Sequence, residues 1–208
     1  MHATSPLPIA VMLAASMFVA AAVHANDSAY TDLNLDNCQT IEADAMGASL
    51  LCKGFKGLEV HFKEGDLRQS VLFGPVDREL QHGAFESFSA FNRVNDKIEW
   101  RRDASGKPFA AILRWFIENP GPDGSPSPES TGQVLVISRV ATPDYQGSCF
   151  VGMVDAKANA NANLLARQVA DQVAAGFDCG MQSPLWYGER GQLTSDRTFS
   201  WPEGYVLE

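Results

Sequence analysis

Residues 97–116 read KIEWRRDASGKPFAAILRWF and predict the β-hairpin around which the fold is built. Its two arms, residues 97–102 and 109–116, are rich in aliphatic, β-branched and aromatic residues, which favour strands. Between them, residues 103–106 read DASG, a sequence of turn formers. The second arm is apolar on both faces apart from Arg114, so we expect it in the centre of a sheet.

Shorter strand patterns lie on either side of this hairpin. Residues 58–62, LEVHF, alternate apolar and polar side chains, as a half-buried strand of an antiparallel sheet does. Gly, Pro and Asp turns separate this segment from the other strand candidates, which are residues 49–52, 70–73, 133–140 and 148–155.

The clearest helix is predicted near the C-terminus. Residues 162–173 place apolar side chains on one stripe at i, i+3 and i+4 spacing, and Asn159 or Asn161 is suited to cap its start. Gly176 is suited to its end. A second, shorter helical turn is expected over residues 85–91, where phenylalanine recurs at every third position and would pack into the core.

These elements predict an α+β fold, in which a mainly antiparallel β-sheet of about seven or eight strands carries a C-terminal helix. A lipocalin-like β-barrel with the same helix outside it is the alternative. We expect a single α+β domain over residues 26–180 and an irregular C-terminal tail, residues 181–208, whose aromatic residues either wrap the domain or stay loose. Residues 118–131 hold four prolines and two glycines and predict a long, mobile loop inserted within a hairpin.

The N-terminal segment has the pattern of an export signal. Residues 1–25 contain no Lys, Arg, Asp or Glu and include an apolar run from Ile9 to Val23. Small residues then stand where a signal peptidase cleaves, and polar Asn26 follows. The run is shorter than the roughly 20 apolar residues of a membrane-spanning helix. We therefore predict a signal peptide at residues 1–25 and a periplasmic or secreted mature protein, with an uncleaved anchor as the alternative.

The chain has four cysteines, and an even number in an exported protein predicts disulfide bonds. Three pairings are possible. We favour the sequential one, which joins Cys38 to Cys52 and Cys149 to Cys179. A zinc site or a redox couple is disfavoured, because no two of the cysteines have Cys-x-x-Cys spacing.

The charge balance limits the classes of partner. The chain has 16 Lys and Arg residues against 25 Asp and Glu, a formal net charge of −9. This balance disfavours nucleic acid and an anionic membrane surface as partners. We expect an unknown protein or small ligand as the partner, and no membrane association after signal cleavage. The oligomeric state does not follow from the sequence.

The most distinctive polar cluster combines Glu99, Trp100 and Arg101 with Arg114 and Trp115. On paired strands, Glu99 would meet Arg114 as an ion pair shielded by the two indoles, and arginine beside tryptophan suits cation–π stacking. One interpretation is a patch that binds an anion or a protein partner. The other is a structural salt bridge on a sheet face.

Signatures of catalysis are missing from the sequence. After the signal peptide only two histidines remain, His61 and His82, and neither lies in a catalytic or zinc-binding motif. His61 is expected at the surface, on the polar face of its strand. Because no phosphate-binding loop or dinucleotide fingerprint occurs either, we predict no catalytic residue, no metal and no cofactor.

Several short blocks of sequence carry a resemblance to a known group of proteins. They are EGDLR at 64–68, IEWR at 98–101, ILRW at 112–115, GQVLV at 132–136 and ANLLAR at 162–167. Over about residues 30–180, these blocks resemble a family of small exported α-proteobacterial proteins with no known activity. The resemblance implies a periplasmic location and no particular function. The family has CHVAYVDA in its last strand, whereas residues 149–156 read CFVGMVDA, so no role of that His or Tyr carries over.

These observations predict an exported periplasmic protein with a non-catalytic binding or inhibitor-type role, which acts through a sheet face or the 118–131 segment. Two alternatives stay open. A hydrolase that works through carboxylates alone would need two acids converging in a pocket, at least one with a raised pKa. A small-ligand carrier would need an apolar cavity of at least about 300 Å³.

The mature protein is expected to begin at Asn26 and to contain no free thiol. Intact mass and a non-reducing peptide map check both points, since they should show the loss of residues 1–25 and linked peptides for the two sequential cysteine pairs. Soluble protein that keeps Met1 inside the cell, with four free thiols, would contradict the prediction.

Overall fold

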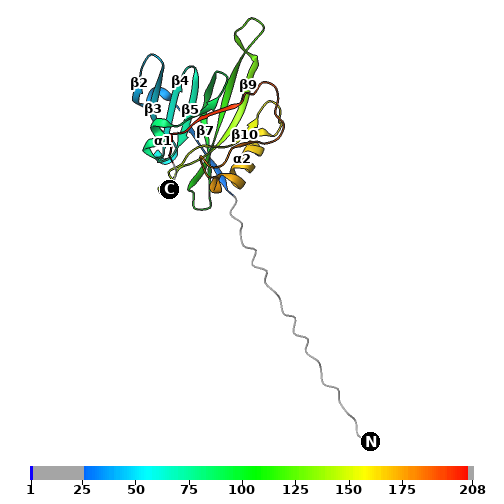
Figure 1. Cartoon of the computed structure of the whole chain (residues 1–208). Coiled ribbons are helices and arrows are strands. Elements are labelled where there is room, and N and C mark those ends of the chain that lie inside the picture. Colours follow the sequence, from blue (N-terminus) through cyan, green and yellow to red (C-terminus); the bar gives the residue numbers. More distant parts are fainter. Residues whose placement is uncertain (2–25, 206–208) are drawn as a thin grey trace.

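The computed structural model describes Met1 and residues 26–205, so the predicted signal peptide lies outside the described residues apart from its first residue. The described chain forms mainly antiparallel β-sheets with α-helices packed against them (Figure 1). The predicted α+β class is therefore confirmed.

The hairpin expected at residues 97–116 lies in the middle of a six-stranded sheet. Its arms belong to β7 (Asn92–Arg102) and β8 (Pro108–Pro120), which pair antiparallel with Glu99 opposite Ile112. The strand order is β1-β7-β8-β9-β10-β11, and all neighbours are antiparallel except β10 and β11. The other four strands are β1 (Asp27–Asp32), β9 (Pro126–Arg139), β10 (Phe150–Asp155) and β11 (Leu185–Trp186).

Two smaller sheets complete the β-structure. A four-stranded sheet follows chain order and consists of β2 (Gln39–Ala43), β3 (Gly47–Lys53), β4 (Glu59–Gly65) and β5 (Arg68–Phe73). At the β4–β5 turn both Asp66 and Leu67 have positive φ, as the central residues of a type I′ hairpin turn do. A two-stranded sheet pairs β6 (Phe85–Phe88) with β12 (Arg197–Ser200).

All of these sheets are open within residues 26–205. The six-stranded sheet ends in β1 on one side and in β11 on the other, and the four-stranded sheet has β2 as an edge strand. A closed barrel would pair its edges. The lipocalin-like barrel considered as the alternative is therefore wrong.

The main core lies between the six-stranded and the four-stranded sheet. Trp100 and Trp115 project into it from β7 and β8 and are almost fully buried. They meet Phe73 and Phe88 edge-on, with ring centroids 5.6 Å apart in both pairs. This is the arrangement that aromatic pairs favour, and burying such large rings contributes strongly to stability.

Helix α2 (Ala162–Val173) covers the other face of the six-stranded sheet, as predicted (Figure 1). It buries the stripe expected from the sequence spacing, and a short 3₁₀ turn (Ala174–Gly176) follows it. The buried helix residues are Ala162, Ala166, Val169 and Ala170. Because most of them are alanines, the helix backbone can approach the sheet closely.

A second helix, α1 (Arg78–Gly83), lies beside the four-stranded sheet. Its N-cap is Asp77, whose Oδ1 accepts hydrogen bonds from the amides of Glu79 and Leu80. Leu80 packs with Leu72 of β5 in a small core of its own. The helix therefore shields part of the outer face of this sheet.

The helical turn expected at residues 85–91 is wrong. Residues 85–88 form strand β6, and the short helix α1 precedes them. Phe88 is fully buried in the main core, whereas Phe91 lies exposed in the following loop. The three-residue spacing of the phenylalanines thus does not correspond to one helical face.

The long loop expected at residues 118–131 is wrong, because most of the segment is strand, although it does lie within a hairpin as expected. β8 and β9 continue into a projecting hairpin and remain paired up to Pro120 and Pro126 (Figure 1). The Nζ of Lys157 donates to the carbonyl oxygens of Pro128 and Thr131, at 2.9 and 2.8 Å, and so braces the hairpin. Prolines are tolerated here because the outer edges of a projecting hairpin need no ladder hydrogen bond.

The C-terminal tail contains regular structure that was not predicted, namely β11 and β12. Its aromatic residue Trp201 packs against the residues between α2 and the sheet as well as those around α1. The tail thus wraps the domain, one of the two outcomes considered. Within the described residues, no helix is long and apolar enough to cross a membrane.

Both predicted disulfides are formed, Cys38–Cys52 and Cys149–Cys179, so all four cysteines are paired. The first joins the residue before β2 to β3. The second joins the residue before β10 to the chain just after α2 and thereby ties the helix to the sheet. The covalent framework is therefore the sequential one.

Replacing Cys149 and Cys179 by Ser is expected to lower the free energy of unfolding by about 3–4 kcal/mol, because the bond closes a loop with a sequence separation of 30. The pair Cys38 and Cys52, with a separation of 14, should contribute about 3 kcal/mol. Urea unfolding of both double variants measures this. A loss under about 1 kcal/mol for either pair would contradict the prediction.

Candidate functional site

The predicted patch is divided between two faces of the six-stranded sheet. Successive side chains of a strand point to opposite faces. Trp100 and Trp115 enter the main core, whereas Glu99, Arg101 and Arg114 lie on the face covered by α2. The indoles therefore do not shield the charged groups, and the five residues do not form one surface.

Arg101 is buried, and its guanidinium donates to acceptors on α2 and β1. Its Nε and Nη2 donate to Oδ1 and Oδ2 of Asp171 at 2.8 and 2.6 Å, a bidentate pair between β7 and α2. Its Nη1 donates to the Oγ of Ser28 on β1 at 2.7 Å. Such forked contacts are the strongest geometry for arginine and carboxylate, so Arg101 fastens the helix and the edge strand to the sheet.

The predicted ion pair between Glu99 and Arg114 is wrong. Glu99 accepts instead from the Nε of Arg167 on α2 at 2.6 Å and from the Oγ of Ser28 at 2.5 Å. Arg114 donates to Gln133 at 3.0 Å. The reason is the register: Glu99 faces Ile112 across the ladder, two residues from Arg114, and the helix brings Arg167 to it.

These charged residues therefore match the structural interpretation rather than the binding one. Arg101 and Glu99 are buried, and each is paired with a residue of α2. Of the polar groups in the patch, Arg114 is the most exposed, and burial lowers its pKa. The network positions α2 on the sheet.

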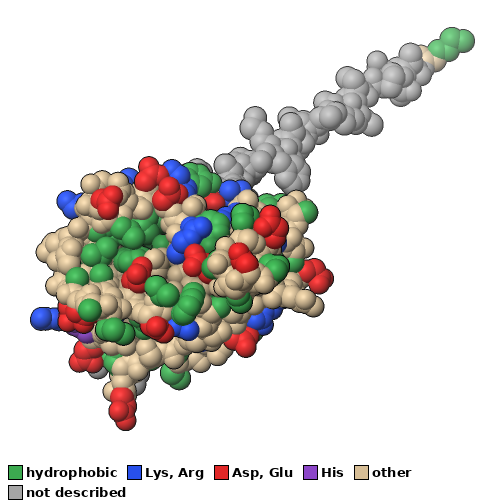
Figure 2. Space-filling model, turned by 90° about the horizontal axis from the view of Figure 1, so that it is seen from above, with side chains coloured by type: hydrophobic (Ala, Val, Ile, Leu, Met, Phe, Trp, Pro, Cys, Tyr) green, Lys and Arg blue, Asp and Glu red, His purple; other side chains and the backbone are tan. Residues whose placement is uncertain are grey.

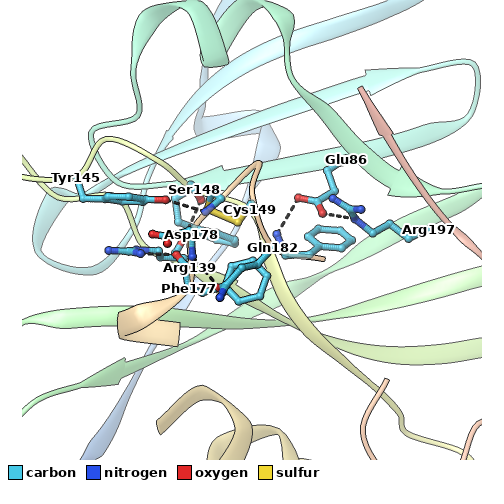
Figure 3. The surroundings of a disulfide bond; sticks show 12 residues. Glu86, Arg139, Tyr145, Ser148, Cys149, Phe177, Asp178, Gln182 and Arg197 are labelled. Carbon is cyan, nitrogen blue, oxygen red and sulfur yellow. Dashed lines mark hydrogen bonds and ion pairs between the residues drawn. A yellow bond between two sulfur atoms is a disulfide. The ribbon is translucent and has the colours of Figure 1, made fainter. Parts of the chain in front are cut away.

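Around the second disulfide lies a buried carboxylate, Glu86 of β6 (Figure 3). One oxygen accepts from the Nε of Arg197 on β12, and the other accepts from the amide of Phe150 at 2.7 Å. Burial raises the pKa of Glu86, and Arg197 opposes this shift. Since protein donors take both oxygens, Glu86 links three strands and does not offer an acid to a substrate, which counts against the carboxylate-hydrolase alternative.

A cavity of about 280 Å³ lies next to Cys179, on the side where the C-terminal tail crosses the domain; we call it the aromatic cavity. Three aromatic rings and one carboxylate stand among its lining residues, which are Tyr145, Asp178, Cys179, Gly180, Met181, Trp201 and Tyr205. Its volume is just under the size that we required for a carrier of apolar ligands. Sequence analysis missed it because its walls come from three separate loops.

A different kind of surface runs along β2, which we call the acidic edge. Every residue of β2 is exposed, and a hollow lies at each end of the strand. The hollow of about 360 Å³ is lined by Glu42, Asp44 and Glu64, and the hollow of about 530 Å³ by Asp36 and Glu59. Five carboxylates thus line the two hollows: Asp36, Glu42 and Asp44 lie on or next to β2, whereas Glu59 and Glu64 lie on β4, one strand further into the sheet.

Lys63 lies in the first hollow, where its Nζ donates to the carbonyl oxygens of His82 and Ala84 at 3.0 and 2.9 Å. Burial lowers the pKa of Lys63 to about 8. These two bonds satisfy carbonyl groups at the end of α1. The lysine therefore holds α1 on the sheet and offsets part of the negative charge of the hollow.

His61, expected at the surface, is buried beneath the same region of the four-stranded sheet. Its Nε2 lies 3.3 Å from the carbonyl oxygen of Gly74 and 3.2 Å from Glu59. Burial lowers the pKa of His61, whereas Glu59 raises it. The expected alternation of β4 is confirmed, since Val60 and Phe62 enter the main core, but the other face is covered by elements that no local pattern predicts.

Residues 26–205 contain no cluster of three or more His, Cys, Asp or Glu side chains suited to hold a metal ion. No protein-family model, no curated protein and no solved structure matches this chain. Function is therefore inferred from the geometry of its surfaces and cavities.

The Arg101→Ala variant is expected to lose about 2–4 kcal/mol of unfolding free energy, because it removes a buried side chain and leaves the carboxylate of Asp171 and the hydroxyl of Ser28 without their donor. Arg114→Ala should lose about 1 kcal/mol or less, since its partners are neutral and partly exposed. Equilibrium unfolding in urea compares the two variants. Equal losses would contradict the roles assigned to the two arginines.

Proposed function

We propose that this chain is an exported, non-catalytic binding protein that takes up an extended, basic segment of a partner protein along the acidic edge. Export to the periplasm or beyond is supported by the signal pattern of residues 1–25 and by the two disulfides, which persist in oxidising compartments. The binding role is supported by the exposed edge strand between two acidic hollows.

The backbone of β2 has groups suited to accept another strand. Within the sheet, β2 pairs with β3 alone. The amide of Asp44 donates to the carbonyl of Gly47, so Ala43 stands at the alternate position, where N–H and C=O point away from β3. An extended peptide that binds these outward groups would add a fifth strand, a common mode of peptide recognition.

The charges at the edge favour a basic segment. Five carboxylates line the two hollows, against the cations Lys53 and Lys63 and the titratable His82. Lys63 is already bonded to two backbone carbonyls. The protein as a whole carries a net charge of −9, and acidic side chains are spread over the face seen in Figure 2. Lysine or arginine at alternate positions of a peptide would meet this field favourably.

The same features protect the protein from pairing with itself. An exposed edge strand is a hazard for aggregation, and charged side chains and bulges are the usual protection. β2 has both, because Glu42 lies on the edge and the pairing with β3 shifts register between Thr40 and Glu42. Two acidic edges repel each other, whereas an acidic edge and a basic strand attract.

A seven-residue peptide that alternates Lys and Thr is expected to bind the protein and to shift the NMR signals of β2 amides. Affinity should fall between about 0.05 and 0.5 M salt, because the attraction is electrostatic. Ala43→Pro removes an outward N–H without removing a bond to β3, so about tenfold weaker binding is expected. Glu42→Gln with Glu64→Gln should weaken binding by a similar factor.

The matched controls separate edge binding from general charge attraction. Asp123→Asn, at the tip of the β8–β9 hairpin, removes a negative charge far from the acidic edge and should leave binding unchanged. The corresponding peptide with Glu in place of Lys should not bind. Binding that survives both Ala43→Pro and the Glu42→Gln, Glu64→Gln double variant, or that Asp123→Asn weakens equally, would overturn the proposal.

A further inference from the structure

We infer that the aromatic cavity is a binding site for a small organic cation of the quaternary ammonium class. This site is independent of the acidic edge and shares no lining residue with either of its hollows. The inference stands on three properties of the cavity: its aromatic walls, a carboxylate at its rim, and a disulfide that fixes one wall.

The walls present ring faces at steep angles to one another. The centroids of Trp201 and Tyr205 lie 6.0 Å apart, with 60° between the ring planes. Tyr145 lines the same cavity from the loop before β10. The negative faces of aromatic rings attract cations, tryptophan most strongly, and a cage of such rings is the usual receptor for a methylated ammonium group. A quaternary ammonium group has no N–H to donate in a hydrogen bond. A mostly aromatic wall therefore suits it.

A cation already lies on one of these rings. The guanidinium of Arg139 stacks on Tyr145, 3.4 Å from the ring centroid, while its Nη1 donates to the carbonyl of Phe177 (Figure 3). Burial lowers the pKa of Arg139, and Asp178 opposes this effect. Arg139 itself is not one of the lining residues of the cavity. Trp201 and Tyr205 form the rest of the aromatic wall, on which the ligand would stack.

A negative charge and a polarizable side chain at the rim of the cavity suit the same ligand. Asp178 lines the cavity and is exposed, while its backbone amide donates to Gln182 at 2.9 Å, so its position is defined. Met181 is 82% exposed beside it and offers a polarizable thioether. A carboxylate in water attracts an organic cation from a distance, and the rings and the thioether then replace part of the ligand's hydration.

The volume limits the ligand to a small one. A cavity of 280 Å³ corresponds to about nine water molecules at roughly 30 Å³ each. A trimethylammonium group with a short substituent fits this space, and a lipid chain does not. Choline is therefore a suitable probe, and its neutral carbon analogue 3,3-dimethylbutan-1-ol has the same shape without the charge.

The second disulfide fixes the wall that carries Asp178. Cys179 lines the cavity, is bonded to Cys149 before β10, and donates its amide to the hydroxyl of Tyr145 at 2.7 Å. Residues 178–181 are thus anchored to the sheet and to one ring of the cage. Losing this bond should loosen the cage, whereas losing Cys38–Cys52 should not.

Titration of the mature protein with choline, followed by calorimetry and NMR, tests the inference. We expect a dissociation constant on the order of 0.1–1 mM, and binding of the neutral analogue at least about tenfold weaker. Trp201→Leu should weaken choline binding about tenfold, and Asp178→Asn about threefold. The Cys149→Ser, Cys179→Ser double variant should weaken it, and the Cys38→Ser, Cys52→Ser double variant should leave it unchanged.

Two results would overturn the inference. Equal affinity for choline and its neutral analogue would mean that the cavity recognises shape alone. No saturable binding of choline up to about 50 mM would mean that the cavity is not a cation site at all. The exposed position of Asp178 makes Asp178→Asn safe for folding, so a change in affinity can be measured even if Trp201→Leu fails to fold.

Discussion

The alternation of side chains along β7 and β8 is the constraint on which the rest of the structure depends. It sends Trp100 and Trp115 to one face, where they meet Phe73 and Phe88, and sends Glu99 and Arg101 to the other. The first face needs a second sheet to bury the indoles. The second face needs groups that satisfy the charges, and α2 supplies Arg167 and Asp171. One pair of strands thereby determines what packs on both sides.

Most strands and the long helix were predictable, because each shows its period in its own sequence. The partner of Glu99 was not, because Arg167 is 68 residues away and reaches it only through the packing of α2. Residues 118–131 were misread for a related reason: proline and glycine mark both loops and projecting hairpins, and pairing up to Pro120 depends on the opposite strand. Composition sets the local preference of the segment. Hydrogen bonding with the opposite strand decides whether it forms a loop or a hairpin.

Neither candidate site was predictable from the sequence. The acidic edge brings together Asp44 of a turn, Glu64 of β4 and Asp36 before β2, which no spacing rule connects. The aromatic cavity combines Tyr145 with Trp201 of the tail, across a gap that contains the whole of α2. The only sequence signal for it was the concentration of aromatic residues after Gly180, where no strand or helix pattern accounts for them. Such a concentration indicates packing against a surface formed elsewhere in the chain.

Each disulfide joins a weakly buried segment of the chain to a hydrophobic core, since Cys52, Cys149 and Cys179 are themselves buried. β2 has no buried residue, so hydrophobic packing does not hold it to β3, and Cys38–Cys52 closes the end of that hairpin opposite its turn. Residues 178 and 180–183 are exposed as well, and Cys149–Cys179 secures them directly after α2. Each of these weakly buried segments borders one of the two proposed sites. An exposed binding surface must give up apolar contacts in order to remain accessible, and a covalent bond fixes its backbone without covering it. The two disulfides thus fix the backbone beside both proposed sites without covering either of them.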